Sequence, residues 1–326
     1  MLNKLVFLLS SMRSASKRSS RSYLSLLREL IVLRYSIGRI GLSEYLDFQL
    51  YKNDLTLEQK LEFGGYRAEG ILEELLVDDY SKFNAIDKVT MYALLDGFNV
   101  PIPTMYAVLG TERPLHRYPS IGSVGELGDF LAEPGNLPVY VKRAFGSYGR
   151  SNTLVERLNE GQLTLGDGAT LTVGQFYDSL RDSSGLGWIL QQPLSPHTAI
   201  SEVCGEKISG LRIHTNLTKT GPRVSHAIWK INVGGLDSDN FGHGESGNLL
   251  GSVNLSTGVV ERVVTGVGAA QRTLSRHPIT RKRLEGFTIP HWQEAKTLTM
   301  EASKVFPGYL SPGWDIAICD EGPKVL

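Results

Sequence analysis

A lysine and a glycine-rich loop stand together in the segment Pro138-Val-Tyr-Val-Lys-Arg-Ala-Phe-Gly-Ser-Tyr-Gly149. The apolar, β-branched run before Lys142 predicts a short strand, and Gly146, Ser147 and Gly149 predict a flexible loop directly after it. Such a strand can fix an ammonium group, while small residues let backbone N–H groups close around an anion. The segment therefore predicts a phosphate-binding site, with a lysine at the end of an ordinary edge strand as the alternative interpretation.

A second lysine opens a predicted helix. The residues from Lys88 to Asp96 have helical spacing, and Gly97 followed by Val100-Pro-Ile-Pro103 predicts an extended exit. Further along, Arg212 lies among apolar residues of a predicted strand, where an unpaired guanidinium would be costly to bury. Its planar fork suits a phosphate or an acyl phosphate, and a structural carboxylate partner is the alternative.

In their order and spacing, these segments resemble the ATP-grasp superfamily. In that superfamily a lysine opens a helix before an exit rich in proline, and a second lysine ends a strand before a glycine loop. Lys88 and Lys142 match these two positions, and the resemblance implies that both contact the phosphates of ATP. The strand Trp188-Ile-Leu-Gln-Gln-Pro-Leu is similar to the segment that joins the two nucleotide-binding lobes. The resemblance therefore implies that Gln191 and Gln192 meet the adenine edge, although many members carry Glu where Gln192 stands.

Two more segments are similar to the sugar-transfer-associated branch of the superfamily. Gly210-Leu-Arg-Ile-His-Thr215 resembles its "TxRxxT" strand, and Lys230 stands where the branch usually has arginine. The resemblance implies that Arg212 and Lys230 take part in catalysis. Asp237-Ser-Asp-Asn-Phe-Gly-His-Gly244 resembles its "vDNfhxGG" segment, which implies that Asn240 binds the nucleotide.

The metal site is implied by the same resemblance. Asp315 heads the last predicted strand, and with Asp239 it would hold Mg²⁺ between the phosphates, because Mg²⁺ prefers hard oxygen ligands. An acid that caps a turn is the alternative for Asp315. The family continues into a Glu-x-Asn motif, and the sequence stops at Leu326, where this motif should begin. We therefore expect either a C-terminally truncated sequence or an incomplete metal site.

Composition limits the classes of function. The chain has 326 residues, 34 basic and 34 acidic, so no basic field predicts nucleic-acid binding. Cys204 and Cys319 lie far apart, which argues against a disulfide framework or a zinc site and predicts a cytoplasmic protein. No acid precedes Glu29, whereas six basic residues do. A membrane-surface helix is one interpretation of this start, but a frayed basic tail is favoured, so membrane contact is not expected.

The predicted fold is α+β: an ATP-grasp fold, two α+β lobes gripping a nucleotide, with a helical N-terminal extension. Four regions are expected, namely a flexible tail at 1–21, a helical region at 22–103, a small lobe at 104–187 and a large lobe at 188–326.

The predicted function is an ATP- and Mg²⁺-dependent ligase that joins a carboxylate to an amine through an acyl phosphate. Its partners would be ATP and a small-molecule or glycan substrate, and the branch suggests polysaccharide or glycoconjugate modification. A small-molecule or sugar kinase and a non-catalytic nucleotide-binding protein remain as alternatives. The chain has no Walker loop, Rossmann fingerprint or Gly-x-Ser-x-Gly elbow, and it gives no indication of oligomeric state.

Overall fold

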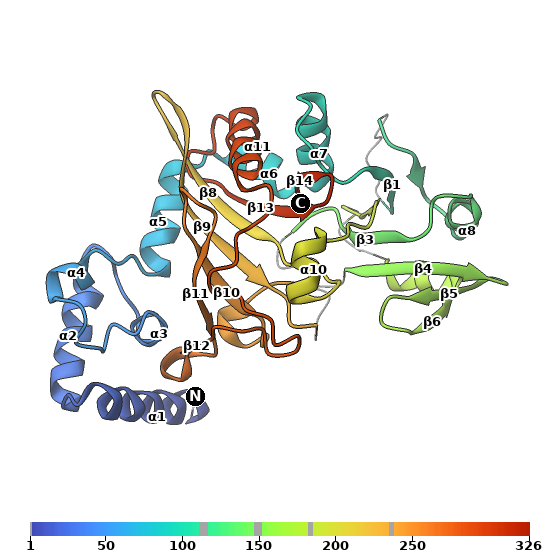
Figure 1. Cartoon of the computed structure of the whole chain (residues 1–326). Helices are drawn as coiled ribbons and strands as arrows, with labels where there is room; N and C mark the ends of the chain where they lie inside the picture. The colour runs from blue at the N-terminus through green and yellow to red at the C-terminus, as the bar shows by residue number, and fades with distance from the viewer. Residues whose placement is uncertain (1, 111–116, 147–151, 182–184, 235–237) are drawn as a thin grey trace.

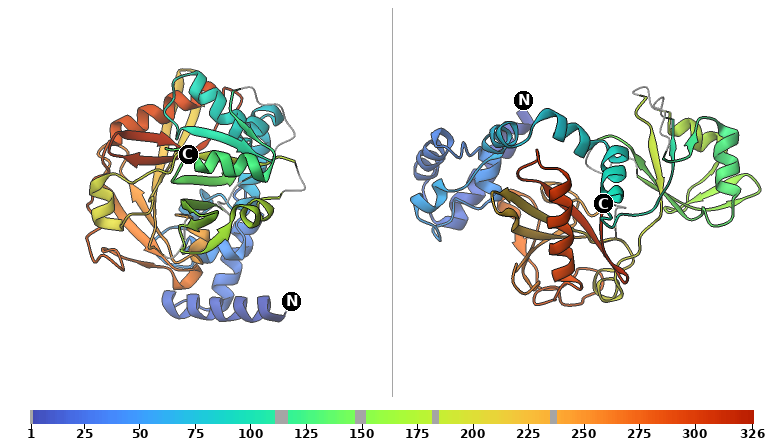
Figure 2. Two further views of the ribbon diagram at one scale, coloured as in Figure 1. Left: turned by 90° about the vertical axis from the view of Figure 1, so that its right-hand side faces the viewer. Right: turned by 90° about the horizontal axis from the view of Figure 1, so that it is seen from above.

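The computed structural model describes residues 2–110, 117–146, 152–181, 185–234 and 238–326 (Figure 1). A helical N-terminal region lies at one end of the molecule and a small lobe at the other, with a larger lobe between them (Figure 2). Within the described residues, seven helices precede the first strand: α1 (Leu2–Ser19), α2 (Tyr23–Tyr35), α3 (Leu42–Asp47), α4 (Leu57–Leu61), α5 (Tyr66–Leu76), α6 (Asp79–Ile86) and α7 (Lys88–Gly97).

The N-terminal helices have a hydrophobic core of their own. Ala15 of α1 and Leu26 and Leu33 of α2 are fully buried in it. The flexible tail expected over residues 1–21 is therefore replaced by a helix, because Ala15 packs into this core. No helix among the described residues is both long and apolar enough to span a bilayer.

Glu29 ties these helices together. Its carboxylate accepts hydrogen bonds from Arg21 at 2.9 Å, from the Tyr45 hydroxyl at 2.7 Å and from Lys60 at 3.1 Å. Burial would raise the pKa of Glu29, but these three donors outweigh it and hold the pKa below its ordinary value. The first acid of the chain is thus the internal partner of buried cations.

The small lobe is built on a seven-stranded sheet with the order β2-β1-β7-β3-β4-β5-β6. Two helices pack on it, and Leu127, Leu131 and Phe176 join its core. Its elements are β1 (Met105–Leu109), β2 (Ser120–Ile121), α8 (Val124–Ala132), β3 (Val139–Arg143), β4 (Thr153–Asn159), β5 (Gln162–Leu165), β6 (Thr170–Thr172), α9 (Val173–Ser179) and β7 (Trp188–Gln191). Because β7 pairs with β1 and β3, this lobe extends to Gln191 rather than ending at residue 187.

The large lobe has a second seven-stranded sheet, ordered β12-β11-β10-β9-β8-β13-β14. Its elements are α10 (Thr198–Cys204), β8 (Leu211–Thr218), β9 (Gly221–Ile231), η1 (Gly242–Gly244), β10 (Leu249–Val253), β11 (Val260–Thr265), η2 (Gly268–Ala270), β12 (Arg272–Thr273), α11 (Trp292–Val305), β13 (Gly313–Cys319) and β14 (Gly322–Val325). Helix α11 covers one face of this sheet: Ser303 bonds to Thr215 at 2.7 Å and to the Trp314 indole at 2.8 Å. Side chains alternate along each strand, so Arg212 and Asp315 leave the sheet on the opposite face, which we call the site face.

Helix α7 connects the two lobes. Val89, Tyr92 and Leu95 are buried in the core that includes Trp229 of the large sheet. The first turn of α7 is bonded to the segment that follows β3 of the small lobe, described below. The α+β class and the helical N-terminal region are thereby confirmed.

Candidate functional site

An arginine and a carboxylate meet on the site face. The antiparallel register places Asp315 of β13 opposite Arg212 of β8, so the two side chains project on the same side. The guanidinium donates from Nε to Oδ1 of Asp315 at 3.0 Å and from NH2 to Oδ2 at 2.8 Å. This two-point contact fixes the plane of the guanidinium beside the carboxylate.

Lys230 joins a second carboxylate to this pair. Its Nζ lies 3.1 Å from Oδ1 of Asp315 and 3.0 Å from Oδ1 of Asp239. The other oxygen of Asp239 accepts the backbone N–H of Gly210 at 2.9 Å. A Cβ at position 210 would stand 2.8 Å from that oxygen, so the contact requires glycine.

Burial and pairing compete in this cluster, and pairing prevails. Burial would raise the pKa of Asp315, but Lys230 and Arg212 hold it below its ordinary value. Burial would likewise lower the pKa of Lys230, yet Asp315 and Asp239 raise it. The cluster of Arg212, Lys230, Asp239 and Asp315 therefore pairs two basic side chains with two acidic ones.

Lys142 approaches this cluster from the small lobe. It is the penultimate residue of β3, is 7% exposed, and donates from Nζ to the hydroxyl of Tyr92 on α7 at 2.7 Å. Burial, and to a lesser extent the charge of Lys88, lower the pKa of Lys142 to about 7, although the charge of Asp315 opposes the shift. Lys142 of β3 is therefore near enough to Lys88 of α7 and to Asp315 of β13 for both charges to affect its pKa.

The N-terminus of α7 is fastened to the glycine loop. Asp87 caps the helix, and the backbone N–H of Lys88 donates to the carbonyl of Ala144 at 2.8 Å. The Lys88 ammonium donates to the carbonyl of Gly146 at 2.5 Å, and burial lowers its pKa. Gly146 has φ +108°, a conformation that favours glycine. The predicted loop residues Ser147 and Gly149 lie outside the described residues.

Strand β7 presents one buried acceptor without a partner. The side chain of Gln191 is 3% exposed, and its Oε1 has no hydrogen-bond partner among the described residues. The neighbouring backbone N–H of Gln192 already donates to the carbonyl of Thr104 at 2.8 Å. Of these two groups, the side chain of Gln191 is the one left to meet a ligand.

Asn240 follows Asp239 directly in the segment before η1. Its backbone N–H donates to the Ser238 hydroxyl at 3.2 Å, and its carbonyl accepts from the Asn248 amide at 3.1 Å. The fully buried Asn248 thus holds this segment beside the cluster. The nearby His243 bonds through Nδ1 to the hydroxyl of Tyr66 on α5 at 2.8 Å. The two residues are 177 positions apart, so the sequence alone does not indicate that they are partners.

Sequence reasoning missed three side chains at this site. Tyr92 is fully buried on α7 and accepts a hydrogen bond from Lys142. From the sequence, a tyrosine four residues after Lys88 in a helix would be interpreted as a core residue. His214 and His226 stack with ring centroids 4.1 Å apart. His214 is two residues from Arg212 on β8, so strand alternation alone could have placed it on the same face. Burial, then His226 and Arg212, lowers the pKa of His214 to about 4.

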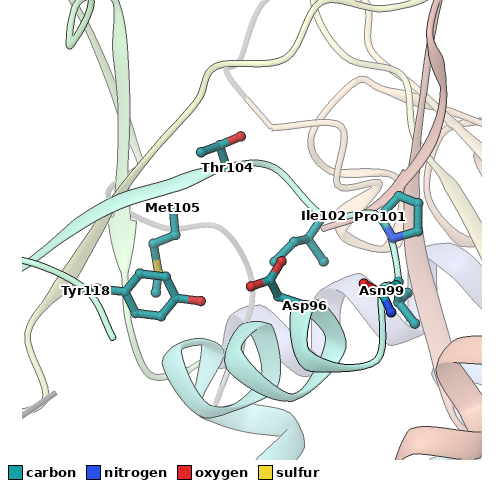
Figure 3. Close-up of a pocket in the computed structure, with 8 residues that line it drawn as sticks. Asp96, Asn99, Pro101, Ile102, Thr104, Met105 and Tyr118 are labelled. Carbon is teal, nitrogen blue, oxygen red and sulfur yellow. The ribbon is translucent and has the colours of Figure 1, made fainter. Parts of the chain in front are cut away.

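A separate pocket of about 370 Å³ lies near the other end of α7 (Figure 3). Asp96 of α7 and Tyr118 point toward one another across it, and Thr104 and Met105 line it from the segment that enters β1 (Figure 3). None of the predicted site residues lines this pocket, so it is distinct from the cluster that contains Lys142 and Asp315.

Comparison with known proteins gives one family match. A family model described as sugar-transfer associated ATP-grasp matches residues 74–326, which leaves α1–α4 outside the match. No curated protein matches the chain.

Solved structures with a related fold include three enzymes. An L-amino acid ligase from Bacillus licheniformis is 10% identical over 75% of this chain and 40% of that chain, with a TM-score of 0.39. An N5-carboxyaminoimidazole synthase from Aspergillus clavatus, in complex with ADP and 5-aminoimidazole ribonucleotide, is 10% identical over 81% and 49%, with a TM-score of 0.43. A D-alanine–D-alanine ligase from Bacillus anthracis is 11% identical over 79% and 62%, with a TM-score of 0.40. The chain thus spans less than two thirds of the length of each.

Proposed function

Because the chain belongs to the sugar-transfer-associated ATP-grasp family, we propose that it is an ATP- and Mg²⁺-dependent ligase that joins a carboxylate to an amine. ATP would phosphorylate the carboxylate, and the amine would displace phosphate from the resulting acyl phosphate. The observation that supports this most is the position of Lys142, which comes from the small lobe, donates to the Tyr92 hydroxyl of α7 at 2.7 Å and lies near enough to Lys88 and Asp315 for their charges to affect its pKa.

The phosphates of ATP would bind at Lys142 and Lys88. Both ammonium groups lose solvation through burial, which lowers their pKa values. The Lys142 ammonium donates its hydrogen bond to a hydroxyl rather than to a carboxylate. A bound triphosphate would supply the missing negative charge, and the loop at Gly146 would close around it.

The adenine would meet β7 through a side chain. The Oε1 atom of Gln191 is a buried acceptor without a partner among the described residues, and the exocyclic amino group of adenine is a donor. The resemblance implied that the backbone of this strand, at Gln191 and Gln192, meets the adenine, and the backbone N–H of Gln192 already donates to the carbonyl of Thr104. Gln191 is therefore the better candidate of the two for adenine recognition.

Magnesium would bind at the two carboxylates together with the nucleotide, through lone pairs that their contacts with Arg212, Lys230 and Gly210 leave available. No group of three His, Cys, Asp or Glu side chains in the described part of the chain could hold a metal by itself. Mg²⁺ usually takes one or two protein carboxylates and completes its shell with water and substrate phosphate. Asp315 and Asp239 would be these two carboxylates, and bound Mg²⁺ would neutralise charge on the phosphates.

Arg212 and Lys230 would stabilise the phosphoryl group that is transferred. Phosphoryl transfer depends mainly on positioning and on charge neutralisation, so a nucleophilic side chain is not required. The fork of Arg212 is held by Asp315, and Lys230 is held between two carboxylates. Both cations are therefore preorganised, which is the arrangement that lowers the cost of stabilising developing charge. We further propose that the carboxylate and the amine belong to small molecules or glycans, and that the reaction takes place in the cytoplasm. The reaction would serve the modification of a polysaccharide or another glycoconjugate.

Two experiments test the proposal. Calorimetric titration of the full chain with ATP should show binding that depends strongly on Mg²⁺, whereas equal binding without the metal would favour a non-catalytic nucleotide-binding protein. Incubation with ATP, a panel of sugar acids and amino acids, and hydroxylamine should then give a hydroxamate, because hydroxylamine traps acyl phosphates. A stable phosphate ester instead of a hydroxamate would identify a kinase.

A further inference from the structure

Helix α2 is apolar on two opposite faces. One face packs inward through Leu26 and Leu33, which are fully buried. The other face carries Leu24, Leu27 and Ile31, which are 68%, 48% and 49% exposed. These three residues recur at intervals of three and four, so they form one stripe along the helix. An apolar stripe on a helix normally faces a core or a partner, and this second stripe faces neither within the described residues.

The apolar stripe continues past the end of α2. Tyr35, one turn after Ile31, is 86% exposed, and Ile37 beyond the helix is 95% exposed. Scattered exposed apolar side chains are ordinary on a protein surface, but a contiguous row marks an interaction site.

Positive charge is concentrated in the same part of the chain. Residues 1–40 contain eight Lys and Arg residues and one acid, whereas the whole chain has 34 of each sign. The remaining residues therefore carry a net charge of −7. The one acid, Glu29, is turned inward to Arg21, Tyr45 and Lys60. Exposed cations include Arg13 and Lys17 on α1, and Arg28 on α2 directly follows Leu27 of the apolar stripe.

We propose that α1 and α2 form a docking surface for an anionic lipid bilayer. The stripe of α2 would enter the boundary between headgroups and acyl chains, and Arg13, Lys17 and Arg28 would lie against the anionic headgroups. Apolar side chains flanked by Lys and Arg are the features of helices that lie in a membrane interface without crossing it. The absence of a membrane-spanning helix from the described residues agrees with this mode.

Charge favours a lipid surface over a second copy of the chain as the occupant. Two copies that met through this face would bring two regions of net charge +7 together, and like charges oppose such a contact. An anionic bilayer is complementary to the same charge. This surface also lies at the end of the molecule away from the small lobe (Figures 1 and 2). The proposed nucleotide site would therefore face solution while the helices rest on the bilayer.

The test is flotation of the full chain with vesicles. Phosphatidylcholine vesicles that contain about one third phosphatidylglycerol should bind the chain, and binding should weaken as salt screens the charges. Pure phosphatidylcholine vesicles should bind it weakly. The triple variant Arg13→Gln, Lys17→Gln, Arg28→Gln should lose roughly 100-fold in partitioning, at about fivefold for each cation. A control with the same charge change elsewhere, Arg157→Gln, Lys219→Gln, Lys282→Gln, should bind as the parent does.

The apolar stripe is tested by a separate variant with its own control. The double variant Leu24→Asn, Ile31→Asn should lose about tenfold in partitioning for each side chain. Ile279→Asn, at a position that is 70% exposed in the large lobe, should have no effect. All of these side chains are exposed, so the variants should keep the parent's circular dichroism and its affinity for ATP.

Two results would overturn the proposal. One is equal binding of the parent and both helix variants to anionic vesicles. The other is no vesicle binding together with self-association in sedimentation velocity that Leu24→Asn, Ile31→Asn abolishes, which would identify a second copy as the occupant. Because lipid binding and ATP binding are measured separately, failure here leaves the proposed function standing, and the reverse also holds.

Discussion

The Lys142 ammonium of the small lobe donates a hydrogen bond to the Tyr92 hydroxyl of α7 at 2.7 Å and lies 4.9 Å from the centre of the tyrosine ring. Tyr92 is fully buried in the core of the large lobe. The lysine that would bind phosphate is thus held in place from the opposite lobe.

Tyr92→Phe should weaken ATP binding without unfolding the protein. The ring and its packing are kept, but the Lys142 ammonium loses a partner worth about 1–3 kcal/mol as a hydrogen bond to a charged group. We expect ATP affinity to fall roughly fivefold or more in calorimetric titration, given that magnitude. Tyr177→Phe is the matched control, since it removes a hydroxyl that bonds to the carbonyl of Gly122 in the small lobe. If the two variants bind ATP equally, Tyr92 has no positioning role.

ATP binding should take up a proton above neutral pH. Burial lowers the pKa of Lys142 to about 7, so the free protein holds much of this group neutral at about pH 8. A triphosphate beside it favours the charged form and raises the pKa again, so a proton enters with the ligand. Calorimetry in buffers of different ionisation enthalpy should show uptake of up to one proton at about pH 8 and little at about pH 6. Lys142→Met should abolish the difference between buffers, and its persistence in that variant would contradict the assignment.

Lys142 should also make the free energy of unfolding depend on pH. Its folded pKa is depressed below the ordinary lysine value of 10.5, so between about pH 7 and that value the unfolded chain binds more protons. The free energy of unfolding should therefore rise with pH across this window because of Lys142. In urea denaturation, Lys142→Met should remove this rise, while a parallel pH dependence in parent and variant would argue against a buried, depressed lysine.

Asp315→Asn should destabilise the large lobe. Removing the carboxylate leaves Lys230, only 6% exposed, with Asp239 alone and leaves Arg212 without its two-point partner. Breaking a buried ion pair costs about 3–5 kcal/mol, and the partial exposure of Arg212 reduces this to roughly 2–3 kcal/mol. Glu301→Gln, which breaks a surface pair with Lys304, should cost about 0.5 kcal/mol or less. Equal midpoints for the two variants in urea would contradict the assignment of Asp315 to a buried network.

The stabilisation that Asp315 provides should be lost at low pH. The pKa of folded Asp315 lies below its ordinary value of 3.8, so its pairing stabilises the protein above that value. The stabilisation is lost as pH falls through the lower folded pKa. The difference in unfolding free energy between parent and Asp315→Asn should therefore shrink below about pH 4, and a difference that stays constant into acid would exclude this linkage.

Local signals in the sequence were enough to predict the elements that carry two of the candidate site residues. Lys142 before its loop and Lys88 at the start of α7 follow from strand and helix patterns that span a few residues. The helix predicted from Lys88 to Asp96 agrees with α7, which the structure has at Lys88–Gly97.

The pairings between distant strands were not predictable. Arg212 and Asp315 are 103 residues apart, and only the register of β8 with β13 places them opposite each other. The same holds for Lys142 and Tyr92, which depend on how α7 packs against both lobes. The N-terminal helix was misjudged because its basic composition suggested a tail, whereas the burial of Ala15 depends on α2 and α3.

The most direct test is ATP titration of Lys142→Met beside Arg157→Gln in the presence of Mg²⁺. The methionine fills the buried volume but removes the charge, and Arg157 is an exposed cation of the same lobe. If Lys88, Lys142 and Asp315 surround a triphosphate, Lys142→Met should bind ATP at least about tenfold more weakly than the parent, and Arg157→Gln should bind as the parent does. Parent-like affinity in Lys142→Met would contradict the account.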